Sequence, residues 1–263
     1  MENSAQVAII GGSGLYDVEM LEGPREIKVH TPYGKPSDVI ILGNYKGKQI
    51  AFLSRHGRGH QTPPHLVNYR ANIWALKQLG VQRILASNAC GSLREDYRPG
   101  DLVIVDQFVD RTKERKSTFY EGPQVCHISS ADPFCSQLRG LLADTTGKLG
   151  YMFHPKGTFV VIEGPRFSTR AESRMFRQWG GDVLTMTVFP ECVLAREAEI
   201  CYASLALVTD YDCLFEHPVN TQEIIEVMKS NVNKAKQVFA SAIENMPAER
   251  NCGCGQALKN AIF

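Results

Sequence analysis

Short apolar runs alternate with longer segments of helical periodicity along most of this 263-residue chain, and this alternation limits the folds it can adopt. The runs are rich in Val, Ile and Leu and are bounded by Gly, Pro or Asp, as buried strands are. We predict strands at residues 7–10, 39–42, 50–53, 84–86, 102–105, 159–162, 183–186 and 204–208. This pattern predicts a single α/β domain, with helices flanking a central mixed β-sheet. We place the domain at residues 1–247 and a C-terminal tail at 248–263.

The helical segments carry boundary signals. Gly80 and Gly150 should each end a helix, because glycine readily adopts the left-handed conformation found there. Asp132 followed by Pro133 predicts an N-cap and a first helical residue. Asn220 is the expected cap of the last helix. We predict helices at 66–79, 133–149, 169–179 and 221–245.

The charge balance argues against nucleic-acid and membrane partners. The formal net charge is +1, and no block of like charges occurs. No apolar run approaches the length of a membrane span. The first residues, Met1 to Ser4, lack the charged and apolar regions of a signal peptide. We therefore expect a cytoplasmic protein.

A glycine-rich turn follows the first predicted strand. Gly11, Gly12, Ser13 and Gly14 could close backbone N–H groups and a hydroxyl around an anion. A dinucleotide fingerprint would need another glycine where Asp17 stands, followed by an amphipathic helix, and neither is present. The turn therefore suits a single phosphate, with a simple tight turn as the alternative.

Polar residues cluster where the predicted strands end, which is where open α/β sheets bind ligands. Arg55 and His56 follow the strand at 50–53, among glycines. A guanidinium beside N–H donors makes a phosphate site, and a solvated basic loop is the alternative. The glycines between His56 and His60 disfavour a helix that would align the two imidazoles as metal ligands. We expect no metal at this site.

Two acids follow the strand at 204–208. Asp210 and Asp212 would point the same way if this segment stayed extended. Paired acids of this kind can divide into a proton donor and a hydrogen-bond acceptor. The alternative is a turn that ends the strand, where Asp is common.

Six of the eight cysteines lie in apolar or helical contexts, typical of small buried side chains. Cys252 and Cys254 differ, because two thiols this close in sequence suggest a local disulfide or a redox pair. A zinc site would need two more ligands, and no second CxC or CxxC motif supplies them. Cys135, early in a predicted helix, and Cys201, at the entry to the strand that leads to Asp210, could form a second bridge. Such bonds are unusual inside cells except in hyperthermophiles, so eight free thiols are the alternative.

A series of ordered motifs runs through the chain: IIGGSGLYD (9–17), TPYGKPSD (31–38), RHGRGH (55–60), NYRANIWALKQLG (68–80), ACGSLRE (89–95), DQFVDRT (106–112), IEGPRFSTRAES (162–173), MTVFPE (186–191) and TDYDC (209–213). Through them the sequence resembles the 5′-methylthioadenosine phosphorylases, within the trimeric purine nucleoside phosphorylase family, over residues 7–245. The resemblance implies that inorganic phosphate, as co-substrate, attacks the anomeric carbon while the purine leaves. The products would be adenine and 5-methylthioribose 1-phosphate. It also implies no metal or organic cofactor and a homo-oligomer, either a trimer or a dimer of trimers.

The resemblance also implies roles for individual residues. Asp210 would protonate the purine N7, which suits the poor leaving group that an adenine anion is. Asp212 would hold the 6-amino group, with Tyr211 beside it. His127 would reach into a neighbouring subunit's site. Phosphate would be bound by Ser13, Arg55, His56, Asn88, the backbone of Ala89, and Thr187. The remaining substrate contacts would be Phe167 at the base, Met186 at the ribose, and Ser168, Thr221, Ile224 and Ile225 at the 5′ end.

The sequence departs from the family pattern in places. Asn88 stands where the family usually has Thr, Thr185 where it has Asn, and Phe189 replaces a smaller residue. A broader phosphorylase acting on adenosine, inosine or guanosine is the nearest alternative, but oxopurine enzymes tend to have Asn where this chain has Asp210. A hydrolase would use an aspartate-rich calcium site, which the sequence lacks. A non-enzymatic nucleotide sensor would not need both the phosphate and the base residues.

Overall fold

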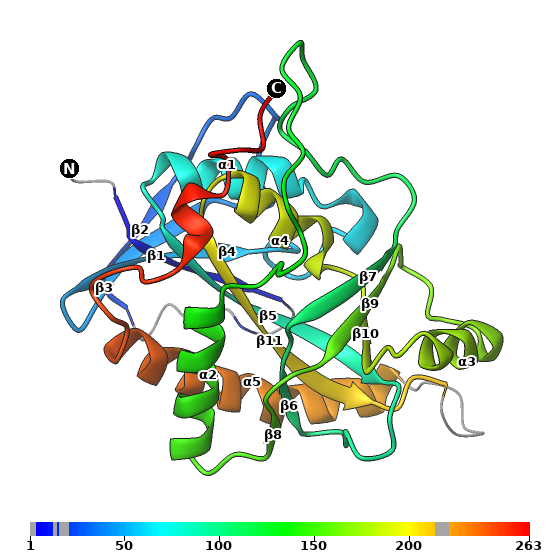
Figure 1. The fold of residues 1–263 in the computed structure, drawn as a ribbon. Helices are drawn as coiled ribbons and strands as arrows, with labels where there is room; N and C mark the ends of the chain where they lie inside the picture. Colours follow the sequence, from blue (N-terminus) through cyan, green and yellow to red (C-terminus); the bar gives the residue numbers. More distant parts are fainter. Residues whose placement is uncertain (1–3, 13–14, 16–20, 214–220) are drawn as a thin grey trace.

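A computed structural model describes residues 4–12, 15, 21–213 and 221–263 (Figure 1). The strands are β1 (Val7–Gly11), β2 (Glu22–Ile27), β3 (Ile40–Tyr45), β4 (Lys48–Ser54), β5 (Arg83–Ser92), β6 (Leu102–Ile104), β7 (Gln107–Arg111), β8 (Phe153–His154), β9 (Thr158–Ile162), β10 (Val183–Thr185) and β11 (Cys201–Asp210). The helices are α1 (Tyr69–Gln78), α2 (Ser136–Lys148), α3 (Arg170–Gln178), α4 (Val188–Glu197) and α5 (Thr221–Glu244). Short 3₁₀ turns lie at Pro64–Leu66 and Gly253–Gln256.

The described strands form one mixed sheet. Its main path runs β2-β3-β4-β1-β5-β10-β9-β7, and β11 pairs with both β5 and β6. The central strand β5 runs parallel to β1 and β11 but antiparallel to β10. The predicted single α/β domain with a mixed central sheet is confirmed.

Helices cover both faces of the sheet (Figure 1). Successive residues of β1 alternate between two cores, as a strand buried on both faces requires. Ala8 and Ile10 pack in the core that includes α1 and α4. Val7 and Ile9 pack in the core that includes α2 and α5. Each fully buried aliphatic side chain contributes about 1.5–3 kcal/mol, so the sheet is fixed between two apolar layers.

Helix α3 lies at the edge of the molecule and packs on β9 and β10 through Phe176. Its start is set by a capping box: the Thr169 side chain accepts from the N–H of Glu172, whose carboxylate accepts from the N–H of Thr169. The predicted helix stops at Gly80 and Gly150 are confirmed, because both adopt positive φ angles, +81° and +72°.

The predicted start of α2 is wrong. The helix begins at Ser136 and its N-cap is Cys135, so Asp132 does not cap it. Phe134 and Cys135 are buried instead, and the N–H of Cys135 donates to the carbonyl of Tyr202 over 2.8 Å. This hydrogen bond holds the segment against β11, so the helix begins only at Ser136.

Helix α4 was not predicted. Its residues are buried on nearly every side, including Val188, Cys192 and Leu194, so the sequence shows no amphipathic stripe. Phe189 has non-helical backbone angles within it, which interrupts the pattern further. Asn220, the expected cap of α5, lies outside the described residues.

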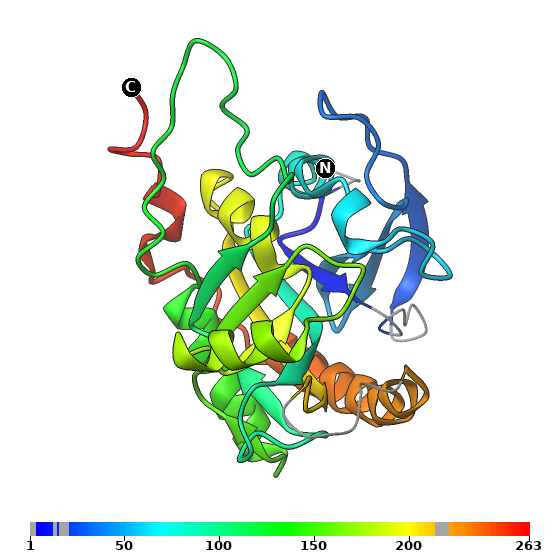
Figure 2. The same ribbon diagram turned by 90° about the vertical axis from the view of Figure 1, so that its right-hand side faces the viewer.

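The C-terminal tail folds back onto the domain (Figures 1 and 2). The N–H of His127 donates to the carbonyl of Ala261 (2.7 Å), and the N–H of Phe263 donates to that of Val125 (2.9 Å). Arg250 donates to the carbonyl of Glu199 over 3.0 Å.

Among the described residues, no helix combines the length and the apolar composition that a membrane span needs.

All eight cysteines are free thiols, so the expected bridges Cys252–Cys254 and Cys135–Cys201 are absent. The sulfur of Cys252 lies 3.4 Å from that of Cys201, which is longer than the roughly 2.05 Å of a disulfide bond. The tail therefore brings its two thiols to Cys135 and Cys201 without forming a covalent pair.

Candidate active site

The central strand β5 changes partner along its length, and the site opens where it does so. On one side it pairs with β1 at residues 83–86 and with β10 only at Gly91 and Ser92. The carbonyl of Ser87 accepts instead from Arg55 (2.9 Å), and that of Ala89 from the hydroxyl of Thr185 (3.1 Å). The N–H and carbonyl of one strand residue point to the same side, so the Ala89 N–H faces the opening.

A pocket of about 240 Å³ lies at this opening, and residues that are far apart in the sequence line it. It combines cationic, acidic and apolar side chains, as nucleotide-sized ligands require. Its lining is Gly12, Arg55, His56, His60, Pro64, Ala89, Cys90, Gly91, Phe167, Leu184, Thr185, Met186, Thr187, Thr209, Asp210, Asp212 and Ile224.

Arg55 supplies the positive charge at one end of the pocket. It is fully buried, and its Nε and Nη2 donate to the two carboxylate oxygens of Glu191, each over 2.7 Å. Burial opposes the charge on Arg55, but the Glu191 carboxylate outweighs that effect and raises its pKa. Tyr202 also donates to Glu191 over 2.7 Å. The guanidinium is therefore held permanently charged and in one orientation.

His56 lies beside Arg55 as a neutral imidazole. Burial, reinforced by the charge of Arg55, lowers its pKa to about 4. Its Nδ1 lies 2.8 Å from the carbonyl of Thr62, which can only accept, so Nδ1 carries the proton and Nε2 is an acceptor. The His60 ring lies 4.3 Å from the His56 ring, between centroids. A dianion bound here would favour a protonated His56.

Asn88 lies beneath the pocket wall and is buried. Its amide donates to the Thr187 hydroxyl (2.7 Å), and its carbonyl oxygen accepts from the Ser204 hydroxyl (2.6 Å). The Thr187 hydroxyl accepts from Asn88, so its own proton is free to point toward a ligand. Asn88 thus orients Thr187 from below.

Asp210 ends β11 at the other end of the pocket. Burial raises its pKa above the ordinary value, against the hydrogen bonds from the Thr209 hydroxyl (2.7 Å) and the Asp212 N–H (2.9 Å). A Cβ on residue 91 would lie 3.0 Å from Asp210 Oδ2, so Gly91 permits this close approach. A carboxyl that is harder to ionise is suited to donate a proton.

Asp212 also lines the pocket, but the segment does not stay extended, and the alternative of a turn that ends the strand is confirmed. The strand ends at Asp210, and Asp212 adopts a left-handed conformation with φ of +46°. The turn is closed by the bond from its N–H to Asp210 Oδ2. Ser168 donates to Asp212 Oδ1 over 2.5 Å, whereas the buried Oδ2 has no partner among the described residues. Asp212 lines the pocket, so a bound ligand could donate to this unpaired oxygen.

An apolar wall closes the rest of the pocket. Phe167 and Ile224 line it, and Phe167 is 45% exposed. A Cβ on residue 164 would lie 2.7 Å from the Met186 sulfur, so Gly164 makes room for that side chain. Ile225 is also 45% exposed and does not line the pocket. Its side chain lies elsewhere because adjacent residues of a helix diverge.

Several predicted site residues stand apart from the lining. Ser168 acts on the pocket through Asp212, and Tyr211 lies between the two acids. His127 is exposed and packs edge-on against Phe263, with ring centroids 5.4 Å apart. Ser13 lies outside the described residues, and the side chain of Thr221 is not among those described.

The sequence reasoning missed Glu191 and Pro64. Glu191 is the last residue of the motif MTVFPE and follows an apolar segment. Its role as the partner of a buried cation could be predicted only if Arg55 were known to face it. Pro64 lies on a 3₁₀ turn whose approach to the pocket follows from tertiary structure.

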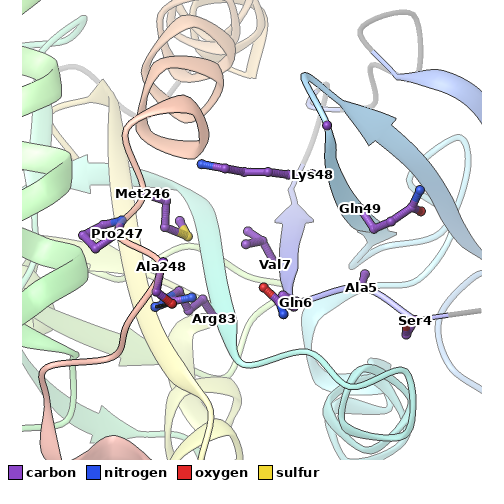
Figure 3. A pocket seen from close by; sticks show the side chains of 11 residues that line it. Ser4, Ala5, Gln6, Val7, Lys48, Gln49, Arg83, Met246, Pro247 and Ala248 are labelled. Atoms are coloured by element: carbon purple, nitrogen blue, oxygen red, sulfur yellow. Dashed lines mark hydrogen bonds between the residues drawn. The ribbon is translucent and has the colours of Figure 1, made fainter. Parts of the chain in front are cut away.

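A second hollow, of about 430 Å³, lies at the amino end of β1 (Figure 3). Lys48 and Arg83 line it, but both cations already serve the fold. Lys48 Nζ donates to the carbonyls of Ile243 and Glu244, and Arg83 to that of Ala248. The chemistry therefore lies in the smaller pocket at the carboxyl ends of the strands.

Comparisons with known proteins agree with this assignment. Residues 6–244 match the family model of the phosphorylase superfamily. The S-methyl-5′-thioadenosine phosphorylase of Hyperthermus butylicus is 55% identical over 263 residues, covering 98% of this chain and 96% of that protein. A methylthioadenosine phosphorylase from an antarctic soil metagenomic library superposes with a TM-score of 0.95 at 46% identity, covering 99% of this chain and 93% of that one. The methylthioadenosine phosphorylase of Schistosoma mansoni, in complex with adenine, gives 0.91 at 39% identity, covering 97% and 96%.

Proposed function

Because the chain belongs to the phosphorylase superfamily, we propose that it catalyses the phosphorolysis of 5′-methylthioadenosine. The products are adenine and 5-methylthioribose 1-phosphate, so the protein is a pentosyltransferase. One observation carries the proposal: a fixed cation, Arg55, and a carboxyl with a raised pKa, Asp210, lie at two ends of one pocket. The names of the relatives support the same substrate.

The cationic end would bind phosphate. Arg55, the Ala89 N–H and the Thr187 hydroxyl offer donors around one point of the pocket. A phosphate dianion close to the anomeric carbon would stabilise the positive charge that develops on the sugar as its base leaves. His56 would bind it more tightly in its protonated form, and Asn88 would act through Thr187. We add Ser13 to this set from the sequence motif.

The acidic end would bind and protonate the base. As the glycosidic bond breaks, its electron pair moves onto the purine, and the proton of Asp210 passes to N7. The unpaired Oδ2 of Asp212 could accept from the 6-amino group, while Ser168 fixes the other oxygen. Phe167 would pack against the base with Tyr211 nearby, and Met186 would lie under the ribose.

The 5′ end of the substrate would meet an apolar wall formed by Ile224, with Thr221, Ile225 and Ser168 around it. A methylthio group suits such a wall better than a hydroxyl does, by about 1–3 kcal/mol. We propose inorganic phosphate as co-substrate, with no organic cofactor and no metal in the reaction.

We further propose a cytoplasmic homo-oligomer, a trimer or a dimer of trimers. Support comes from the resemblance, which implies that His127 reaches another subunit, from the exposure of His127, and from a surface hollow of about 540 Å³ lined partly by aromatic side chains. Eight free thiols fit a reducing compartment. Light scattering coupled to size-exclusion chromatography measures the oligomer.

The deciding experiment measures adenine release from 5′-methylthioadenosine with and without phosphate, using sulfate to hold ionic strength constant. We expect release only with phosphate, together with a stoichiometric sugar phosphate. Equal release in both buffers would favour a hydrolase and refute the proposal.

A further inference from the structure

Four cysteines that are far apart in sequence converge on one point of the fold. Cys135 caps α2, Cys201 opens β11, and Cys252 and Cys254 flank the start of the last 3₁₀ turn. Their sulfur atoms all lie within 4.8 Å of one another. Three of the four side chains are buried, and Cys252 is half-buried. Figures 1 and 2 both show the tail lying at the amino-terminal end of α2.

The spacing of these sulfurs is that of a metal site. Tetrahedral zinc binds four thiolates at about 2.3 Å, which sets neighbouring sulfurs roughly 3.8 Å apart. The sulfurs of Cys201 and Cys252 are 3.4 Å apart, all four lie within 4.8 Å of one another, and no pair is bonded. Two thiols of a CxC motif and two from the domain complete the ligand set that the sequence alone did not supply.

The surroundings fit a bound cation that carries four thiolates. The amino end of a helix favours negative charge, and Cys135 stands there on α2. Arg139 and Arg196 line an adjoining hollow of about 400 Å³ that also reaches Cys252 and Cys254. Asp106 and Asp132 line the same hollow, so its fixed charges balance, and it gives an ion a route from solvent.

The position of the cluster suits a structural role. Cys201 and Asp210 are the first and last residues of β11, so the cluster lies at the end of the strand opposite to the pocket. The cluster brings the tail against β11 and α2, two elements of the core. A metal there would stabilise the fold without touching the substrate.

We propose that Cys135, Cys201, Cys252 and Cys254 bind one structural Zn²⁺ ion. Each thiol loses its proton to solvent as its sulfur–zinc bond forms, so no oxidant is needed. A closed set of four sulfur ligands leaves no open position for a substrate, and the metal therefore anchors the tail.

The test is the metal content of protein purified without chelators. We expect about one zinc per chain by inductively coupled plasma mass spectrometry, and at least a tenfold loss in Cys252→Ser. Cys126→Ser is the matched control, because Cys126 is a half-buried cysteine outside the cluster, and it should keep its zinc. Replacement of zinc by Co²⁺ should give the intense charge-transfer band of thiolate ligands.

Thiol counts distinguish the alternatives. After denaturation in chelator without reductant, the proposal predicts all eight thiols to be titratable. No zinc with four thiols recovered only after reduction would establish disulfides in place of the metal. No zinc with eight free thiols would show buried cysteines alone, and bound iron would contradict zinc. If Cys252→Ser fails to fold, metal analysis and cobalt exchange of the unaltered protein still decide the question.

Discussion

Replacing Asp210 by Asn should remove the acid while leaving the pocket intact. In the structure, Asp210 accepts from the Thr209 hydroxyl on Oδ1 and from the Asp212 N–H on Oδ2. An Asn side chain can keep its oxygen toward Asp212 and turn its amide toward Thr209. The Thr209 hydroxyl then accepts from the amide and donates to the carbonyl of Cys90, which lies 3.1 Å away. Every hydrogen bond has a replacement, so folding should be preserved.

The cost should therefore fall on catalysis. General acid catalysis is typically worth a factor of about 10²–10⁴ in rate. At 1.36 kcal/mol per tenfold, this corresponds to about 2.7–5.4 kcal/mol of transition-state stabilisation. Burial raises the pKa of Asp210, so its charged form is disfavoured in the fold. Above the ordinary pKa of Asp, the carboxylate thus lowers stability, and Asp210→Asn should be at least as stable as the parent at pH 7.

The assay is the pH dependence of adenine release at saturating phosphate. The acid works only when protonated, so kcat/KM of the parent should fall as pH rises through the raised pKa of Asp210. Asp210→Asn should lack this limb and should lose less activity on a 6-oxopurine nucleoside than on 5′-methylthioadenosine. Asp144→Asn, on the exposed side of α2, is the matched control and should behave as the parent. Activity of Asp210→Asn within threefold of the parent, or an unchanged pH limb, would refute the reasoning.

Glu191→Gln should lower the free energy of unfolding by about 3–5 kcal/mol in urea denaturation, because Arg55 is left as an unpaired buried charge. The same variant should raise KM for phosphate more than KM for the nucleoside, and equal effects on both constants would contradict the assigned role. By proton NMR the pKa of His56 should lie at about 4 in the free protein and rise when phosphate is added; a value above 6 without phosphate would contradict its burial. Ile224→Asn should reduce the preference for 5′-methylthioadenosine over adenosine by about tenfold or more, whereas the exposed Ile225→Asn should not; parallel losses in both variants would place the 5′ group elsewhere.

Much of the fold could be predicted from local signals. The apolar runs located β1, β4, β9, β10 and β11 to within three residues at each end, whereas β5 extends six residues beyond the predicted 84–86; Gly80 and Gly150 ended helices as expected. What failed depended on tertiary contacts. The backbone N–H of Cys135 donates to β11, so α2 begins later than its sequence signals indicate. Helix α4 is buried and has no polar face, so its sequence shows no amphipathic pattern.

The candidate site likewise contains residues that local signals predict and residues that only tertiary contacts bring together. Strand ends point to Arg55, His56, Asp210 and Asp212 because parallel strands finish at one edge of a sheet. Their sequence neighbours do not reveal that Glu191 pairs with Arg55, since the two residues are 136 positions apart. The cysteines show the same limit, because nothing in the CxC motif indicates that Cys135 and Cys201, on two separate elements, lie beside it.

The gap in pairing along β5 has an evolutionary consequence. Donors that belong to the main chain, such as the Ala89 N–H, are retained by every substitution except proline. Neighbouring positions can then change without removing the donors proposed to bind phosphate. Asn88 is such a position, since it supports Thr187 from within the core. Related chains can accordingly differ in the side chains around the proposed phosphate site and still offer the same backbone donors.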